Sequence, residues 1–275
     1  MRKLMILALV LTVCPKELAI ADKPESFEIL FSGNGDINSY IYFKQDGAYF
    51  IDTELKANIE ILRYRRFYFL IDLNEEVYMG RKYRSNMVFD PNRGSWSFGV
   101  SGQMELKKYF IDMQMHHDCF HDIGRWMAID YSIYWNSPRI GFGTIGYLAK
   151  NKYHRFNHQE PGIRFTKKIE YYLQAGFYAP RGGSWQKNHD YDFTMQTNFH
   201  LPLVRYKNVG FEIESNNFWV VNTVHELKRK HGLNFDFVIF GKKGVAIVYL
   251  GWWPDDTQSI RNRDGRTAFG IHLGF

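Results

Sequence analysis

The clearest pattern in the chain is an alternation of apolar and polar positions. Between residues 109 and 116 the odd positions hold Tyr109, Ile111, Met113 and Met115. The even positions are mainly polar and include Asp112, Gln114 and His116. Successive side chains of a β-strand point to opposite faces of its sheet. The segment is therefore predicted to be a strand with one apolar and one polar face.

The last ten residues show the same alternation. One face of this segment is wholly apolar and consists of Phe269, Ile271, Leu273 and Phe275. The other face is small or polar and includes Gly270, His272 and Gly274. The pattern predicts a strand over 266–275 that ends on a terminal phenylalanine.

Further segments of this kind indicate about twelve strands. They are predicted at 58–73, 95–106, 108–119, 126–136, 139–150, 162–170, 171–180, 190–203, 208–220, 231–240, 244–253 and 266–275. The segment 162–180 could form one strand or two, and residues 26–54 could add a hairpin. The expected number therefore lies between about ten and fourteen, and an even number is typical of bacterial barrels. No helical periodicity interrupts the series, which predicts a single domain.

The first 21 residues have the composition of a secretory signal peptide. Arg2 and Lys3 precede an apolar run from Leu4 to Val13, and small residues lead to a cleavage position after Ala21. This three-part pattern is typical of an exported protein, and the run is too short for a membrane-spanning helix. A buried strand or a lipoprotein signal at Cys14 are the alternatives.

Composition extends this picture to the fold class. Aromatic residues make up 17% of the chain, yet the mean hydropathy is −0.38. In a transmembrane barrel, the apolar outer face with its aromatic girdles and the polar lumen face together give a high aromatic content and a low mean hydropathy. We therefore predict an all-β protein, an antiparallel transmembrane β-barrel in the outer membrane of a Gram-negative bacterium. A soluble, secreted β-sandwich is the alternative fold.

Three parts of the chain follow from these predictions. Residues 1–21 form the signal peptide, 22–57 form either a periplasmic segment or a first hairpin, and 58–275 form the barrel. The polar face of the strand near residue 112 would face the lumen. The alternating C-terminal residues resemble the insertion signal of outer-membrane barrels, so outer-membrane lipids and the barrel insertion machinery are the expected partners.

Charge and cysteine content narrow the function classes. The formal net charge is +6 at pH 7, and no long run of Lys and Arg suggests binding to nucleic acid. Only Cys119 remains once the leader is removed, so a disulfide-dense scaffold is excluded. No cofactor and no resident metal are predicted, and the oligomeric state stays open.

The stretch HHDCFHDIGR is the main candidate for chemistry. If the alternation continues, His117, Cys119 and His121 lie on the lipid-facing side of the strand. A histidine and a thiol on one face can act as base and nucleophile. The same residues with His116 could hold Zn²⁺ only if the strand breaks into a loop, because a straight strand spreads three alternate residues over about 13 Å. A solvated strand end without chemistry is the third interpretation.

Two resemblances bear on these residues. The His-x-Cys pair resembles the His-x-Ser pair that outer-membrane phospholipases and lipid A deacylases carry near the membrane boundary, with Cys119 in the place of the serine. As a whole, the chain is similar to a family of bacterial outer-membrane proteins known only as a domain of unknown function. That likeness rests on HHDCFHDIG, YYLQAGFY, and VAIVYLGWWPDDTQ with FGIHLGF. It implies a barrel in the outer membrane and carries no established activity.

The sequence therefore leaves three functions open. A structural or pore-like barrel is the first prediction. A lipid-modifying hydrolase that uses His117 and Cys119 is the alternative, and a surface-binding protein that uses its outer loops is the third.

Overall fold

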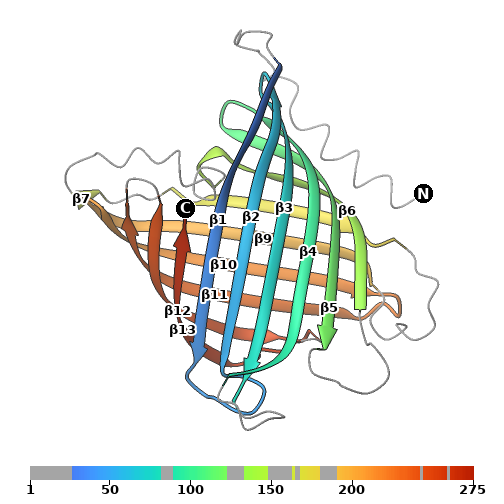
Figure 1. Cartoon of the computed structure of the whole chain (residues 1–275), viewed down its shortest axis with the longest axis vertical. Coiled ribbons are helices and arrows are strands. Elements are labelled where there is room, and N and C mark those ends of the chain that lie inside the picture. The colour runs from blue at the N-terminus through green and yellow to red at the C-terminus, as the bar shows by residue number, and fades with distance from the viewer. Residues whose placement is uncertain are drawn as a thin grey trace.

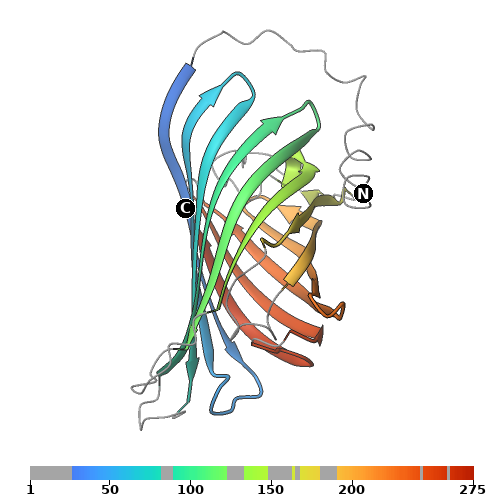
Figure 2. The ribbon, with the colours of Figure 1, turned by 90° about the vertical axis from the view of Figure 1, so that its right-hand side faces the viewer.

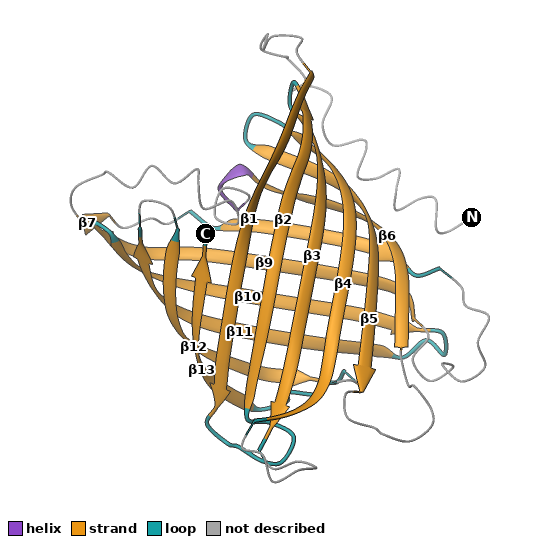
Figure 3. Cartoon of the chain, viewed as in Figure 1, coloured by secondary structure: helices purple, strands orange, loops and turns teal. Residues whose placement is uncertain are grey.

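A computed structural model shows a chain made almost entirely of β-strands (Figure 3). It describes residues 27–81, 89–122, 133–147, 163–164, 168–179, 191–241, 244–258 and 261–275. The predicted signal peptide lies outside these ranges. One helical turn occurs at 145–147. No helix within the described ranges is long and apolar enough to cross a membrane.

The strands form one closed antiparallel barrel (Figure 1). Their bounds are β1 (Phe27–Tyr42), β2 (Ile51–Tyr64), β3 (Phe67–Gly80), β4 (Asp90–Glu105), β5 (Tyr109–Asp122), β6 (Ile133–Thr144), β7 (Ile163–Arg164), β8 (Glu170–Phe177), β9 (Tyr191–Tyr206), β10 (Val209–Asn222), β11 (Leu227–Phe240), β12 (Val245–Asp256) and β13 (Arg266–Gly274). The short β7 and the longer β8 pair with successive parts of β9, so they share one position in the barrel. Twelve strand positions result, which confirms the predicted fold class.

Several predicted strand boundaries were wrong even though the number was right. The segment 58–73 contains the turn between β2 and β3, at Arg65 and Arg66. Arg65 has a positive φ of 55°, a conformation that Gly or Asn usually supplies, so the turn left no signal in the sequence. Conversely, the described parts of the two strands predicted at 126–136 and 139–150 belong to the single strand β6, and residues 126–132 and 148–150 lie outside the described ranges.

The N-terminal segment takes part in the barrel from its first described residue. Residues 27–42 form β1, and the next part of the chain enters β2 at Ile51. The barrel start expected at residue 58 therefore lies inside β2. In Figure 1 the strands of the N-terminal half cross in front of those of the C-terminal half, as in a barrel with strongly tilted strands.

The barrel closes where the first strand meets the last. β1 pairs with β13 from Asp36 opposite Gly274 to Tyr42 opposite Ala268. Beyond the ladder, Gly35 and Phe275 exchange two backbone hydrogen bonds of 2.8 and 2.9 Å. The apolar face of β13 points outward, and its exposed residues are Phe269, Ile271, Leu273 and Phe275.

The two ends of the barrel differ in their connections (Figure 2). One end, here called the short-turn end, carries the close of the β1–β13 ladder, the brief connections β2–β3, β4–β5, β9–β10 and β11–β12, and the longer connection from β6 to β8. The other, the long-loop end, carries the connections β1–β2, β3–β4, β5–β6, β8–β9, β10–β11 and β12–β13. In bacterial barrels the short turns face the periplasm.

The place where β1 pairs with β13, here called the seam, allows a test of how the barrel is packed. A Cβ atom on Gly270 would lie 2.2 Å from Cζ of Tyr249, whose hydroxyl donates to Oδ1 of Asn38 at 2.8 Å. We expect Gly270→Ala to lower the free energy of unfolding by about 1–3 kcal/mol, because the ring must move and lose its partner on β1. Unfolding in urea, followed by the heat-dependent gel shift of the folded barrel, measures this.

Gly232→Ala is the matched control for that variant. Its added Cβ would meet its nearest atom, in Trp253, at 3.4 Å, an ordinary contact. The control should unfold at nearly the wild-type urea concentration. Equal behaviour of the two variants would contradict the packing described for the seam.

Candidate functional site

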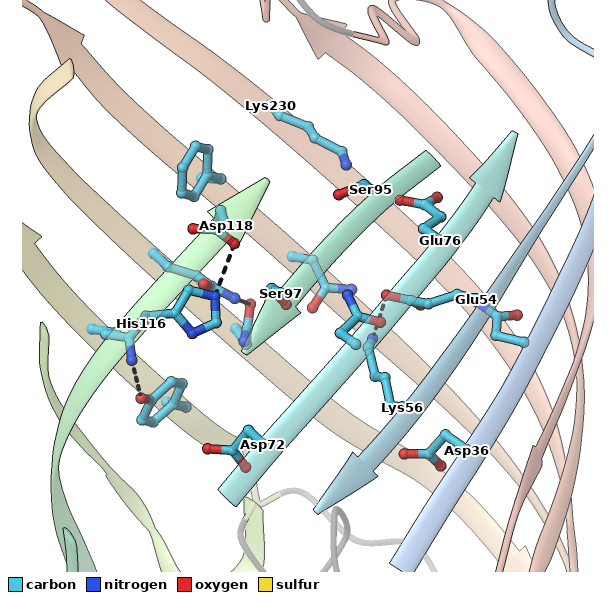
Figure 4. A pocket seen from close by; sticks show the side chains of 18 of the residues that line it. Asp36, Glu54, Lys56, Asp72, Glu76, Ser95, Ser97, His116, Asp118 and Lys230 are labelled. Atoms are coloured by element: carbon cyan, nitrogen blue, oxygen red, sulfur yellow. Dashed lines mark hydrogen bonds and ion pairs between the residues drawn. The ribbon is translucent and has the colours of Figure 1, made fainter. Parts of the chain in front are cut away.

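The inner wall of the barrel surrounds a polar cavity of about 810 Å³. Side chains of both charges line it, including Glu54, Lys56, Glu76 and Lys230 (Figure 4). Asp112, Gln114 and His116 also line this cavity, from the even-numbered face of β5. The cavity is a mixed-charge lumen rather than a ring of one sign.

Hydrogen bonds tie two polar residues of β5 to strands two positions away around the barrel. Gln114 Nε2 donates to Asp72 Oδ2 on β3 at 3.0 Å, and the hydroxyl of Tyr172 on β8 donates to Asp112 Oδ2 at 2.9 Å. Within β5 itself, His116 Nε2 lies 2.9 Å from Oδ1 of Asp118, beside which Figure 4 shows it. Gln114 and Asp112 thus act as cross-links between barrel strands.

Arginines fill the lumen at the long-loop end. Arg261 and Arg263 follow β12 in the chain and are only 5% and 3% exposed. Arg261 Nη2 lies 2.5 Å from Asp52 Oδ1, and Arg263 Nη2 lies 2.5 Å from Glu76 Oε1 and 3.2 Å from Asp52 Oδ2. Burial opposes the charge of Arg263, but the combined attraction of Glu76 and its other neighbours in the lumen, including Asp52, outweighs burial and raises the pKa of this guanidinium.

The outer wall of β5 carries the residues predicted for chemistry. His117 lies between Phe98 on β4 and Asn136 on β6. Its Nδ1 is 2.8 Å from Oδ1 of Asn136. An amide oxygen only accepts hydrogen bonds, so Nδ1 carries the proton and Nε2 is left as an acceptor. The Asn136 side chain thus holds His117 in the tautomer that a general base requires.

The structure does not bring the three predicted residues into one cluster. Cys119 is partly exposed and lies between Trp96 and Tyr134 in the strand register. His121 packs its edge against the ring of Trp96, with centroids 5.0 Å apart. His117 and Cys119 share a face of β5, and no hydrogen bond joins these two described residues. Alternate residues of a strand have Cα atoms about 6.6 Å apart, so a side-chain rotation is needed for contact.

A metal site formed with His116 is not possible in this arrangement. His116 points into the lumen cavity, whereas His117 and Cys119 line a groove on the other face of β5. Within the described ranges, no three side chains of His, Cys, Asp or Glu are placed to hold a metal ion. The side chain of Asp122, two residues beyond the strand's last aromatic, lies outside the described residues.

A mainly apolar groove of about 410 Å³ adjoins His117 and Cys119 on the outer wall. Its apolar residues come from β2, β3 and β4 and are Leu55, Ala57, Leu73, Trp96 and Phe98. Glu75 is the carboxylate that also lines it, and Lys56 lines it too, with its ammonium paired to Glu54 at 2.9 Å. The groove therefore places an imidazole and a thiol at the edge of an apolar channel.

A second histidine on the outer wall makes a comparable bond. His231 Nδ1 lies 2.8 Å from Oδ1 of Asn217, and the ring packs against Trp219. The residues two positions away on the same strand are Arg229 and Leu233, neither of which is a nucleophile. The His–Asn bond is thus repeated in the barrel, and only the copy on β5 has a thiol on the same strand face.

Sequence reasoning missed Asn136. It is 17 residues from Cys119, and the connection between β5 and β6 separates the two. Only the register of β5 against β6 identifies it as the neighbour of His117. The split of β6 into two predicted strands hid that register.

Known structures resemble this chain in architecture. Outer membrane phospholipase A from Escherichia coli is 7% identical, with a TM-score of 0.48 over 88% of this chain and 92% of that one. The Salmonella typhi phospholipase dimer with bound calcium is 7% identical, with a TM-score of 0.47 over 93% and 94%. CdiB from Acinetobacter baumannii is 11% identical, with a TM-score of 0.43 over 90% and 61%. No protein-family model matches the chain, and no curated protein matches its sequence.

The arginine contacts in the lumen lead to a stability prediction. Arg263→Met removes the guanidinium that pairs with the fully buried Asp52 and the partly buried Glu76, and breaking a buried ion pair from one side costs about 3–5 kcal/mol. We expect unfolding in urea at a clearly lower concentration, measured by tryptophan fluorescence in detergent micelles. Arg229→Met is the control, because its pair with Asp255 is 48% and 33% exposed and contributes less than about 1 kcal/mol.

Proposed function

We propose that the protein is an outer-membrane barrel that hydrolyses acyl esters of membrane lipids on its outer wall. The observation that carries this proposal is the hydrogen bond between His117 and Asn136, with Cys119 on the same face of the same strand. A base held by an amide and placed near a thiol has the composition of a Cys-His-Asn triad. Cys119 is the proposed nucleophile, His117 the base, and Asn136 the group that orients the imidazole.

The placement of the barrel in the outer membrane belongs to this proposal. Met113 and Met115, on the face of β5 that carries His117, are 66% and 54% exposed. An exposed apolar wall around a polar lumen is what a membrane barrel requires. Outer-membrane lipids would then surround the wall, and the alternating C-terminal strand would be recognised by the barrel insertion machinery.

The chemistry follows from these roles. Nε2 of His117 takes the proton of the Cys119 thiol as sulfur attacks the ester carbonyl. The ester C–O bond breaks, and the imidazolium returns the proton to the alcohol that leaves. Water then attacks the thioester, with its proton passing to Nε2, and the fatty acid and the free thiol are released. No further reactant is needed.

The observed geometry is compatible with an unliganded site. Catalytic hydrogen bonds are often long in the absence of substrate and tighten in the complex. The Cys119 side chain already lines the groove, so an acyl chain against Leu73 and Phe98 would bring its ester to the polar edge of the groove. The thiol and the imidazole would close on that ester from one side.

Substitution of the three residues tests the proposal. In mixed micelles of phospholipid or lipid A, Cys119→Ala should abolish release of fatty acid. His117→Ala should lower it by about 10²–10⁴-fold, the usual contribution of a general base. Asn136→Ala should cause a smaller loss, because the imidazole remains but is no longer held in one tautomer.

His231→Ala is the matched control, since it removes the other His–Asn bond of the outer wall. It should leave hydrolysis unchanged. Mass spectrometry of the wild-type protein stopped during turnover should show an acyl group on Cys119. Activity that survives in Cys119→Ala, or an acyl group absent from this peptide, would exclude the proposed nucleophile.

A structural or pore-like role is the second candidate. The polar cavity of about 810 Å³ favours it, because a polar lumen is a requirement of a solute path. The buried pairs of Arg261 and Arg263 oppose it, since they place two guanidinium groups in the lumen at one end. Conductance in planar bilayers separates the two roles, and a steady open current from the wild-type protein would favour the pore.

A further inference from the structure

Glu75 lies on the outer wall, where a carboxylate is unusual. Its neighbours Asn74 and Glu76 line the lumen cavity, so the alternation of β3 turns Glu75 outward. Leu73, two residues away on the same outward face, is 42% exposed. Glu75 also lines the apolar groove that contains His117 and Cys119.

The carboxylate of Glu75 makes no hydrogen bond or ion pair with another described residue. Inside the barrel the situation is different, because Glu54 pairs with Lys56 at 2.9 Å and Glu76 with Arg263 at 2.5 Å. A charged group on a lipid-facing wall is costly, and such residues usually have a partner connected with function. Since no described residue of the chain supplies that partner, we look for it in a ligand with a cationic group.

The strand register places Glu75 at a defined distance from the nucleophile. Glu75 is opposite Trp96, and Trp96 is opposite Cys119. Two strand spacings separate the backbones of Glu75 and Cys119, which is about 9.5 Å. The glycerophosphate link of a phospholipid can span this separation, from its ester carbonyl to a cationic group on its head.

We propose that Glu75 is a headgroup subsite that selects phospholipids carrying an ammonium group. The inference rests on the proposed lipid hydrolysis, because it assigns the substrate class of the same groove. The ammonium donates hydrogen bonds to the carboxylate, and the acyl chains lie along Leu73, Trp96 and Phe98. An anionic headgroup such as glycerol phosphate would face the carboxylate as a like charge and is disfavoured.

Protection of Cys119 from alkylation tests binding without turnover. The protein is placed in nanodiscs of a neutral diether matrix with either diether phosphatidylethanolamine or diether phosphatidylglycerol, whose ether bonds cannot be hydrolysed. The rate of reaction of Cys119 with N-ethylmaleimide, a neutral reagent, is followed by peptide mass spectrometry. We expect about tenfold slower alkylation with the ethanolamine lipid, the effect of one hydrogen bond to a charged group.

Glu75→Gln should abolish the difference between the two lipids while the barrel stays folded, as judged by its heat-dependent gel shift. Glu226→Gln is the control, because it removes the same charge from the connection between β10 and β11, outside the groove. This control should keep the wild-type preference. The proposed headgroup subsite would be contradicted by either of two results. One is equal protection by both lipids in the wild-type protein, and the other is a lipid preference that persists in Glu75→Gln.

Turnover with ester lipids separates the two proposals. If the ethanolamine preference in alkylation depends on Glu75 but no fatty acid is released, the headgroup subsite stands and the hydrolase fails. If fatty acid is released without preference in either assay, the hydrolase stands and the subsite fails. For an active enzyme, Glu75→Gln should raise KM for the ethanolamine lipid about tenfold with little change in kcat.

Discussion

Closure of the β-sheet is the constraint on which the rest of this protein depends. A barrel leaves no strand with unpaired backbone groups, and in a membrane such groups would be costly. The closing pair of β1 with β13 extends to the last residue, where Gly35 and Phe275 exchange backbone hydrogen bonds. Because pairing continues around the whole circumference, each strand has one inward and one outward row of side chains. The polar lumen and the apolar outer wall are both consequences of this alternation.

Inside the barrel, buried charged side chains form ion pairs with one another. Asp52 is fully buried and Glu76 lies close to it, and both meet guanidinium groups from the chain between β12 and β13. A buried pair of this kind does not by itself stabilise a fold, because desolvation offsets much of the attraction. Its effect here is to tie a connection at the long-loop end to the walls of β2 and β3. Two buried guanidinium groups thus line the lumen at that end.

The outer wall departs from the expected apolar surface at one place. Glu75 on β3, His117 and Cys119 on β5, and Asn136 on β6 are polar residues at or beside a groove whose other walls are mainly apolar. Polar groups in such a position are expected to have partners. His117 pairs with Asn136, and the sulfur of Cys119 accepts a hydrogen bond from the backbone N–H of Trp96, whereas Glu75 has no partner among the described residues. The lipid substrate proposed above would meet Cys119 and Glu75 at once, because it presents an ester and a charged headgroup at the same surface.

The sequence by itself determined the class of fold and the faces of individual strands. Period-two alternation needs only neighbouring residues, so the lumen side of Asp112 and the outer side of His117 and Cys119 could be read from a single strand. The turn at Arg65 escaped because no glycine or asparagine marks it, and the unity of β6 escaped because its Ser137-Pro138 dipeptide resembles a turn. Only the tertiary structure decided which strands lie side by side. Register across strands therefore placed Asn136 against His117 and Glu75 near Cys119, since such pairings depend on hydrogen bonds between segments far apart in the chain.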